Sequence, residues 1–214
     1  MTPYYADDLV TIYHGDALEI LPQIAHADMV LTDPPYPAEY QHLFGEMAAL
    51  TLPLVERGAS LVTLCGQHQM FDVQRDIAAS GWRYWWCGGM RHTVYGRLPG
   101  KWVAAMWKPA LWFVKETRRE SDTRTPFDML EGGKRDKRYH EWGQPVYWFR
   151  HWMENLSDPG DVVLDPFMGA GTTLVAAIQG RRRAIGIELD EAHCETAVRR
   201  IQDLTSLALP MGAA

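Results

Sequence analysis

The sequence predicts an α/β fold in which helices cover both faces of a parallel sheet. Short apolar runs of strand length alternate with stretches of helical spacing, and several of these runs end in an acidic residue. Such alternation is typical of β-α-β units, whose helices pack against the two faces of one sheet. At 214 residues, the chain fits a single domain, 1–214, with room for a small insert.

The first half of the chain contributes three predicted strands and two predicted helices. The strands are expected at 9–16, 28–33 and 59–64, and the helices at 39–56 and 66–81. Pro34 and Pro35 stop the second strand, because proline donates no hydrogen bond to a sheet. Gly58 and Gly81 stand where the two helices should end, a usual position for glycine.

The second half begins with aromatic, strand-like segments and ends with regular alternation. Strands are expected at 82–86, 109–115, 161–165 and 183–189, and helices at 145–156, 171–180 and 191–207. Pro145 suits the first turn of its helix. Residues 116–144 are polar and rich in Gly, Lys, Arg and Asp, so they are expected to form a loop or insert.

Composition excludes several classes of protein. No apolar run approaches the roughly 20 residues of a membrane helix, so no membrane partner is expected. The N-terminus lacks the pattern of a secretory signal. Three scattered cysteines form neither a disulfide framework nor a CxxC metal pair, and the histidines show no ligand spacing, so no metal is expected. A reducing, cytoplasmic location follows as the default.

The charge is distributed unevenly, although the net charge is only −6. Residues 1–56 contain no Lys or Arg, whereas residues 77–115 contain no acid and hold six cations among six tryptophans. Cations interleaved with aromatic rings suit a polyanion with stackable bases. A tryptophan-rich core with a solvated basic rim explains the same pattern, and both interpretations remain open.

The segment 162–177, VVLDPFMGAGTTLVAA, has the form of a nucleotide site. A buried strand ends at Asp165, a glycine turn follows, and a helix begins, which is how open α/β sheets bind nucleotides. Gly169 and Gly171 allow the backbone to approach a ligand closely. Glu188 ends the next strand, about 20 residues beyond the glycines, where a ribose-binding carboxylate is usual. A tight turn without a ligand is the alternative.

The motif TDPPY, residues 32–36, lies at the end of another predicted strand. The Asp33 carboxylate and the Pro34 carbonyl can each accept a hydrogen bond from an amine, and Pro35 helps to fix the direction of that carbonyl. Tyr36 offers a flat face for a base. Together they describe a socket for a planar group that bears an NH₂, and a rigid turn is the structural alternative.

With these motifs, the sequence resembles the amino-methyltransferases of DNA. The resemblance rests on DPPY at 33–36, DPFMGAGTT at 165–173 and GIELDE at 186–191, and it spans about residues 9–205. The catalytic word precedes the cofactor loop, which resembles the permuted beta class. HGDALEIL (14–21) resembles the acidic motif of that class, and HEWGQP (140–145) resembles its HPxxKP segment, with Glu141 and Gln144 as departures.

The resemblance implies a Rossmann-like methyltransferase sheet with circularly permuted motif order, and S-adenosylmethionine as cofactor. The implied cofactor contacts are Asp16, Asp165, Phe167, Gly169, Gly171, Thr172 and Glu188. The implied catalytic residues are Asp33, Pro34, Pro35 and Tyr36. The implied reaction is methylation of adenine N6 in DNA, with the base flipped into the socket. Trp86 is either a second wall of that socket or a core aromatic.

Residues 87–144 match the family poorly, as expected for a small DNA target-recognition insert. The candidate DNA-binding residues are Arg91, Arg97, Lys101, Lys134 and Arg135. An insert of this size predicts a short or relaxed target site. The target itself, a homodimer and a partner restriction enzyme all remain open.

Other activities compete with adenine methylation. Methylation of cytosine N4 is the same reaction on another amine. In the family that the sequence resembles, Ser in the first position of the catalytic motif favours cytosine and Asp favours adenine, so the resemblance implies adenine for Asp33. RNA, a protein amide or a non-catalytic nucleotide-binding module are more distant alternatives. Methylation of cytosine carbon 5 needs an activated thiolate, and none of Cys65, Cys87 and Cys194 has such a setting.

Overall fold

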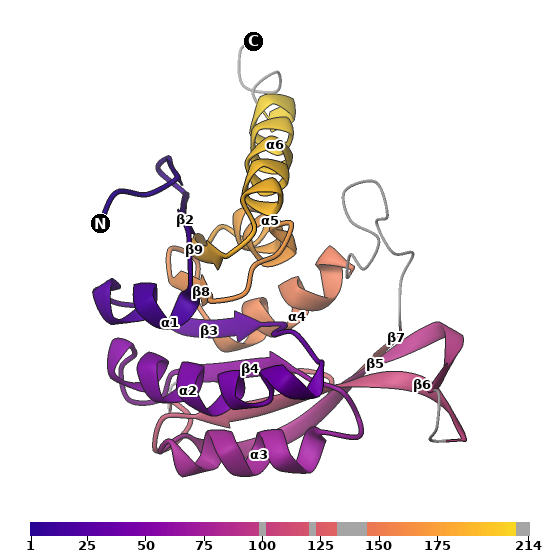
Figure 1. Ribbon diagram of the computed structural model, residues 1–214. Helices are drawn as coiled ribbons and strands as arrows, with labels where there is room; N and C mark the ends of the chain where they lie inside the picture. Colours follow the sequence, from indigo (N-terminus) through magenta and orange to yellow (C-terminus); the bar gives the residue numbers. More distant parts are fainter. Residues whose placement is uncertain (99–101, 120–122, 132–144, 209–214) are drawn as a thin grey trace.

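The computed structural model describes residues 1–98, 102–119, 123–131 and 145–208 (Figure 1). Within these ranges one sheet of nine strands forms the centre of the fold. In order across the sheet, the strands are β1 (Tyr5–Ala6), β2 (Val10–His14), β9 (Arg183–Glu188), β8 (Val162–Asp165), β3 (Met29–Thr32), β4 (Ser60–Leu64), β6 (Val103–Val114), β5 (Arg83–Leu98) and β7 (Met129–Glu131).

Helices cover both faces of this sheet, as the sequence predicts. The α-helices are α1 (Ala17–Ile20), α2 (His42–Thr51), α3 (Met70–Ala79), α4 (Val146–Leu156), α5 (Thr172–Gln179) and α6 (Glu191–Ala208). Short 3₁₀ turns are η1 (Leu21–Gln23), η2 (Ala38–Tyr40) and η3 (Leu52–Leu54). Helices α1 to α3 lie on one face and α4 to α6 on the other (Figure 1).

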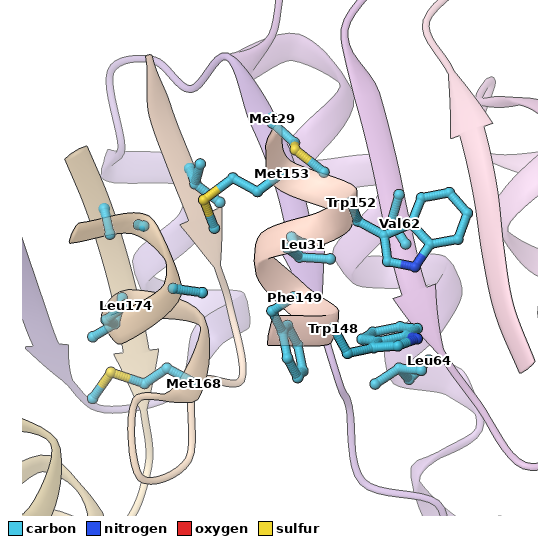
Figure 2. Packing of buried hydrophobic residues seen from close by; sticks show 14 of the residues in the cluster. Met29, Leu31, Val62, Leu64, Trp148, Phe149, Trp152, Met153, Met168 and Leu174 are labelled. Carbon is cyan, nitrogen blue, oxygen red and sulfur yellow. The ribbon is translucent and has the colours of Figure 1, made fainter. Parts of the chain in front are cut away.

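The alternation of side chains along the central strands explains the two cores. Met29 and Leu31 of β3 belong to the cluster under α4, whereas Val30 between them belongs to the cluster on the opposite face. On the α4 face, the side chains of Trp152 and Trp148 lie beside Val62 and Leu64 of β4 (Figure 2). Both faces of these strands are buried, which accounts for their continuous apolar sequence.

The sheet is mixed, which corrects the expectation of a parallel sheet. Strands β2, β9, β8, β3 and β4 are parallel, but β6 runs antiparallel to β4, and β5 runs antiparallel to β6. β1 is likewise antiparallel to β2. The reason is that β5 and β6 form one hairpin, whose two strands must run in opposite directions.

The hairpin is much longer than the segments 82–86 and 109–115 predict. β5 continues to Leu98 and β6 begins at Val103, and the outer part of the hairpin projects beyond the helical layers (Figure 1). In the outer part of β6, Val103, Ala104 and Met106 are exposed, so this end of the strand does not pack on the core. Residues 129–131, expected in a loop, form β7 along the edge of β5.

No helix among the described residues is long and apolar enough to cross a membrane.

Candidate functional site

Four carboxylates that the sequence singles out meet at one edge of the sheet. β2, β9, β8 and β3 are adjacent and parallel, so their carboxyl ends lie side by side. Asp165 and Glu188 end β8 and β9, while Asp33 and Asp16 follow β3 and β2. Ligands of open α/β sheets bind at this edge. The two motifs that the sequence predicts to be functional therefore lie next to each other.

A hydrogen bond joins the two motifs directly. The Thr32 hydroxyl donates to Asp165 Oδ1 over 2.7 Å, and both side chains are buried. The backbone N–H of Phe167 donates to the same oxygen over 3.1 Å. Thr32 immediately precedes Asp33, so this bond couples the position of the DPPY turn to the start of the glycine loop.

Burial dominates the electrostatics of Asp165. Loss of solvent raises its pKa from 3.8 to about 6, although hydrogen bonds from Thr173, Thr32 and the Phe167 N–H oppose the shift. The negative charge of Asp33 adds to the increase. Asp165 is thus a carboxyl group that titrates near neutrality at the centre of the candidate site.

Tyr36 and Lys108 both hold the Asp33 carboxylate. The hydroxyl of Tyr36 donates to Oδ1, and the ammonium of Lys108 donates to both oxygens, over 3.1 Å to Oδ1 and 2.9 Å to Oδ2. The Asp33 side chain keeps 22% of its surface exposed. An acceptor that is fixed in orientation and still open to solvent is what the proposed amine socket requires.

Tyr36 packs against this group rather than pointing away from it. The Lys108 ammonium lies over the Tyr36 ring, 4.5 Å from its centroid. Burial, followed by the charge of Asp33, raises the pKa of the Tyr36 hydroxyl well above its usual value. The Gln69 amide donates to the Tyr36 carbonyl over 2.6 Å and so ties the turn to the start of α3. Pro34 is buried and Pro35 half-buried beside it.

The glycine loop leaves space beside a held carboxylate. Gly169 has φ +51°, and a Cβ added to it would meet nothing within 4 Å. Its N–H donates to Glu188 Oε2 over 2.9 Å, and the N–H of Asp190 donates to Oε1 over 2.8 Å. A carboxylate oxygen accepts more than one hydrogen bond, so Glu188 retains capacity for two hydroxyl groups. An adenosyl cofactor with a ribose fits this arrangement.

Gly171 and Thr172 have structural partners in α6. A Cβ on Gly171, which has φ +77°, would lie 2.8 Å from the Cβ of Ala197. Arg200 donates to the Ala170 carbonyl and, over 3.3 Å, to the Thr172 hydroxyl. Gly171 therefore permits close packing of the loop on α6, in addition to any contact with a ligand.

The two remaining predicted cofactor residues flank this loop. Asp16 is exposed and caps α1, because its carboxylate accepts from the N–H of Leu18 over 2.8 Å. β2 and β9 pair His14 with Glu188, which places Asp16 near the end of β9. Phe167 is half-buried in the turn after β8.

The cysteines are unsuited to nucleophilic catalysis. Burial raises the pKa of Cys65 and of Cys194 to about 12, and it also raises the pKa of Cys87. The thiolate needed for methylation of cytosine carbon 5 is therefore suppressed at all three positions. This agrees with the expectation from the sequence.

The acid-free stretch 77–115 divides between core and surface, so it does not face a ligand as a whole. Trp82 and Trp112 are buried in the core, and Lys115 donates to the carbonyls of Leu52 and Val55. By contrast Trp102 is 97% exposed.

Trp86, for which a core position was one interpretation, is 54% exposed. Its indole N–H donates to Asp128 over 3.3 Å. The core interpretation of Trp86 is wrong, and the second-wall interpretation stays a prediction.

The described structure locates part of the predicted DNA-binding set. Arg91 is exposed on β5 and pairs with Glu131 of β7 over 3.4 Å. Arg97 lies on the outer part of β5, where its backbone pairs with Ala104. Lys101, Lys134, Arg135 and the segment around Gln144 lie outside the described residues.

Three side chains at the site escape sequence reasoning: Lys108, Gln69 and Arg200. Lys108 is 75 residues from Asp33, and only the antiparallel pairing of β6 with β4 brings it to this edge. The one signal in the sequence is a lysine directly before the apolar run that begins at Pro109, since a cation seldom opens a buried strand without a partner.

Comparison with known proteins assigns this architecture to a family. The family model described as DNA methylase, N6_N4_Mtase, matches residues 27–199. The protein named "Putative methylase YubD" of Escherichia coli (strain K12) is 27% identical, over 87% of this chain and 86% of YubD. The DNA adenine methyltransferase YhdJ of the same strain is 24% identical, over 92% of this chain and 84% of YhdJ.

Solved structures show the same fold. The M1.HpyAVI–SAM complex is similar with a TM-score of 0.74 and 26% identity, covering 90% of this chain and 100% of that one. The cytosine-N4-specific PvuII DNA methyltransferase has a TM-score of 0.81 at 20% identity, covering 99% of this chain and 90% of that one.

The family and the SAM complex indicate S-adenosylmethionine as the cofactor, as the sequence predicts. The matched segment contains the DPPY turn, the glycine loop and the Glu188 strand end. With the site geometry, this match shows that the chain belongs to the N6/N4 family of DNA methylases.

Proposed function

We propose that this protein transfers the methyl group of S-adenosylmethionine to the N6 amine of adenine in DNA. The observation that carries the proposal is the Thr32–Asp165 hydrogen bond, which couples the amine socket at Asp33 to the cofactor loop after β8. An acceptor for an amine and a site for a methyl donor thus share one sheet edge. The catalytic turn precedes the cofactor loop in the chain, which supports the permuted beta class.

The proposed cofactor site is formed by Asp165, the glycine loop and Glu188. Glu188 would accept from the ribose hydroxyls, Asp16 would lie at the adenine end, and Phe167, Gly169, Gly171 and Thr172 would line the remainder. When bound, S-adenosylmethionine supplies an electrophilic methyl group on sulfur. The exposed space beside Gly169 and the fixed carboxylate of Glu188 support this assignment.

The proposed work of the DPPY turn is to position the amine. The lone pair of an adenine N6 is delocalised into the ring, which makes the nitrogen a weak nucleophile. Asp33 and the Pro34 carbonyl would accept the two amine hydrogens, favour a pyramidal nitrogen and direct its lone pair at the methyl group. The N–CH₃ bond forms as the S–CH₃ bond breaks, and the proton lost from nitrogen passes to Asp33 or to water.

Tyr36 would stack on the extruded base, since the target nitrogen is inaccessible inside a duplex. Trp86 is the candidate for a second wall, and its exposure supports that role.

The β5–β6 hairpin is the proposed DNA-reading part of the insert 87–144. Its outer part projects beyond the helical layers, carries the fully exposed Trp102 and includes Arg91 and Arg97 (Figure 1). Aromatic and cationic side chains on a projecting hairpin suit stacking and phosphate contacts. Lys101, Lys134 and Arg135 lie outside the described residues, and their contact with DNA stays a proposal from the sequence.

Cytosine N4 is the alternative target, because the fold is shared with the cytosine-N4-specific PvuII enzyme. The name of YhdJ and the Asp at position 33 support adenine. Mass spectrometry of nucleosides from DNA treated with the enzyme distinguishes the two. N6-methyladenine is the expected product, and N4-methylcytosine would transfer the assignment to the alternative with the same mechanism.

The role of Asp33 is tested with Asp33→Asn, which keeps the shape and removes the charge. Turnover is expected to fall by about 10²- to 10⁴-fold, the usual contribution of a positioned proton acceptor. Binding of S-adenosylmethionine, measured by calorimetry, is expected to persist. Glu39→Gln removes an exposed charge six residues away and should leave turnover unchanged. An Asp33→Asn enzyme with the parent rate would refute the mechanism.

A further inference from the structure

Lys108 occupies an unusual position for a lysine. It lies on β6, is only 9% exposed, and reaches the carboxyl edge of the sheet. Strand β6 pairs Ala110 with Leu64, the last residue of β4, and the Pro109 carbonyl accepts from the Cys65 N–H. This register places Lys108 just beyond the end of β4, beside the turn that follows β3.

The ammonium contacts both functional side chains of the DPPY turn. Nζ lies 2.9 Å and 3.1 Å from the two oxygens of Asp33 and 4.5 Å from the centroid of the Tyr36 ring. The ammonium on both oxygens holds the direction of the carboxylate, and the Tyr36 hydroxyl on Oδ1 limits its rotation. The same cation lies over one face of the Tyr36 ring, so a base would have to stack on the other face.

Stability alone does not account for this pair. The Lys108 side chain is 10% exposed and the Asp33 side chain 22%, so both groups lose most of their hydration. The desolvation of two charges offsets much of their attraction, and well-packed apolar residues often replace such a pair without loss of stability. A buried lysine on an otherwise apolar strand end therefore indicates a function.

We propose that Lys108 is a positioning residue for methyl transfer that acts through Asp33. This inference rests on the proposed function. Lys108 compensates the charge of the partly buried Asp33 carboxylate and holds its oxygens at the amine socket. Asp33 can then serve as a hydrogen-bond acceptor for the amine while the base lies against Tyr36. Lys108 itself touches neither the methyl group nor, in this scheme, the reacting nitrogen.

A double-mutant cycle with Lys108→Met and Asp33→Asn tests the proposal. Methyl transfer from labelled S-adenosylmethionine to DNA gives kcat and the KM for DNA, and calorimetry gives the cofactor affinity. Lys108→Met is expected to lower kcat by about 10- to 100-fold, within the range of coupling between contacting residues. The cofactor affinity and the KM for DNA should stay within about threefold of the parent, because no binding contact is assigned to Lys108.

The decisive comparison is made in the Asp33→Asn background. There Lys108→Met should change kcat by less than about threefold, since the residue through which it acts is already altered. If Lys108→Met lowered kcat by the same factor in the parent and in the Asp33→Asn enzyme, Lys108 would act independently of Asp33, and the inference would be overturned. A Lys108→Met enzyme with the parent kcat would overturn it as well. If Asp33→Asn itself has the parent rate, the proposed function fails first, and the two failures are thus distinguishable.

Lys108→Arg keeps the charge and provides a second variant if Lys108→Met does not fold. The longer, planar cation should retain Asp33 as a charged acceptor but shift its oxygens, so kcat should fall less than in Lys108→Met. In the Asp33→Asn background this variant too should have no further effect. Thermal unfolding of each protein verifies that rates are compared between folded enzymes.

Discussion

Asp165 provides a prediction about stability that comes directly from its burial. The carboxyl group is fully buried behind the glycine loop, and its pKa is raised from 3.8 to about 6. Each tenfold change in proton affinity corresponds to about 1.36 kcal/mol, so ionisation of Asp165 costs the folded protein about 3 kcal/mol.

Whether stability rises or falls with pH depends on which state, folded or unfolded, binds the proton more tightly. Below about pH 3.8 the folded and unfolded states both hold it, and the contribution to stability is fully present. Between pH 3.8 and about pH 6 the unfolded chain releases the proton while the folded protein keeps it. Stability is therefore lost as the pH rises through this window, and the loss is complete above it.

Asp165→Asn removes this titration and retains an oxygen that can accept from Thr32 and from the Phe167 N–H. The free energy of unfolding of parent and variant is measured by urea denaturation at intervals from pH 4 to pH 7. The difference, variant minus parent, should increase by about 2–2.5 kcal/mol across this range. A difference that stays constant with pH would refute the assignment of the titration to Asp165.

Thr32→Val tests why the pKa of Asp165 is raised, because it removes one of the hydrogen bonds that oppose the effect of burial. Valine keeps the shape of threonine but donates no hydrogen bond, and the Thr32 hydroxyl lowers the pKa of Asp165. Its removal should raise this pKa further and move the loss of stability to higher pH. Movement to lower pH would contradict the opposition between burial and hydrogen bonding at this carboxyl group.

Three further predictions concern the cofactor, the core and the DNA. Glu188→Ala should weaken S-adenosylmethionine binding in calorimetry by tenfold or more, about 1.5–3 kcal/mol, whereas Glu191→Ala on the exposed first turn of α6 should not; equal affinities would remove Glu188 from the site. Gly88→Ala places a Cβ 2.5 Å from the Trp152 ring and 2.8 Å from the Asp128 carbonyl. It should cost about 1–3 kcal/mol in urea denaturation, while Gly45→Ala, with ordinary contacts in α2, should not destabilise, and an unaffected Gly88→Ala protein would contradict this packing. Replacement of Arg91, Arg97 and Lys101 by Gln should reduce the slope of log K for DNA binding against log salt concentration by about one for each of these cations that binds a phosphate. Arg75→Gln on α3 is the control and should leave the slope unchanged. An unchanged slope in the triple variant would place the interface elsewhere.

The sequence by itself predicted most of the helices and strands and the two motifs of the site, but not the short elements β1, α1 and β7. The ends of β3, β8 and β9 are predicted to within one residue from apolar runs stopped by proline, a glycine turn or an acid, which are local signals. Because parallel strands place their carboxyl ends on one edge, the meeting of Asp33 with the glycine loop also follows once the sheet is assumed. The family resemblance then supplied the cofactor, which the comparisons indicate as well.

Only the tertiary structure decided what surrounds these motifs. The antiparallel insertion of β6 beside β4 brings Lys108 to Asp33, and the packing of α6 brings Arg200 to the glycine loop. The tertiary structure also shows that residue 171 must be glycine because a side chain there would collide with Ala197. It shows further that the aromatic segments at 82–86 and 109–115 belong to one long hairpin. These contacts join residues far apart in the chain, and their partners depend on strand order and direction. Local periodicity specifies a residue's face on its own element, but it carries no information about which distant strand or helix will lie against that face.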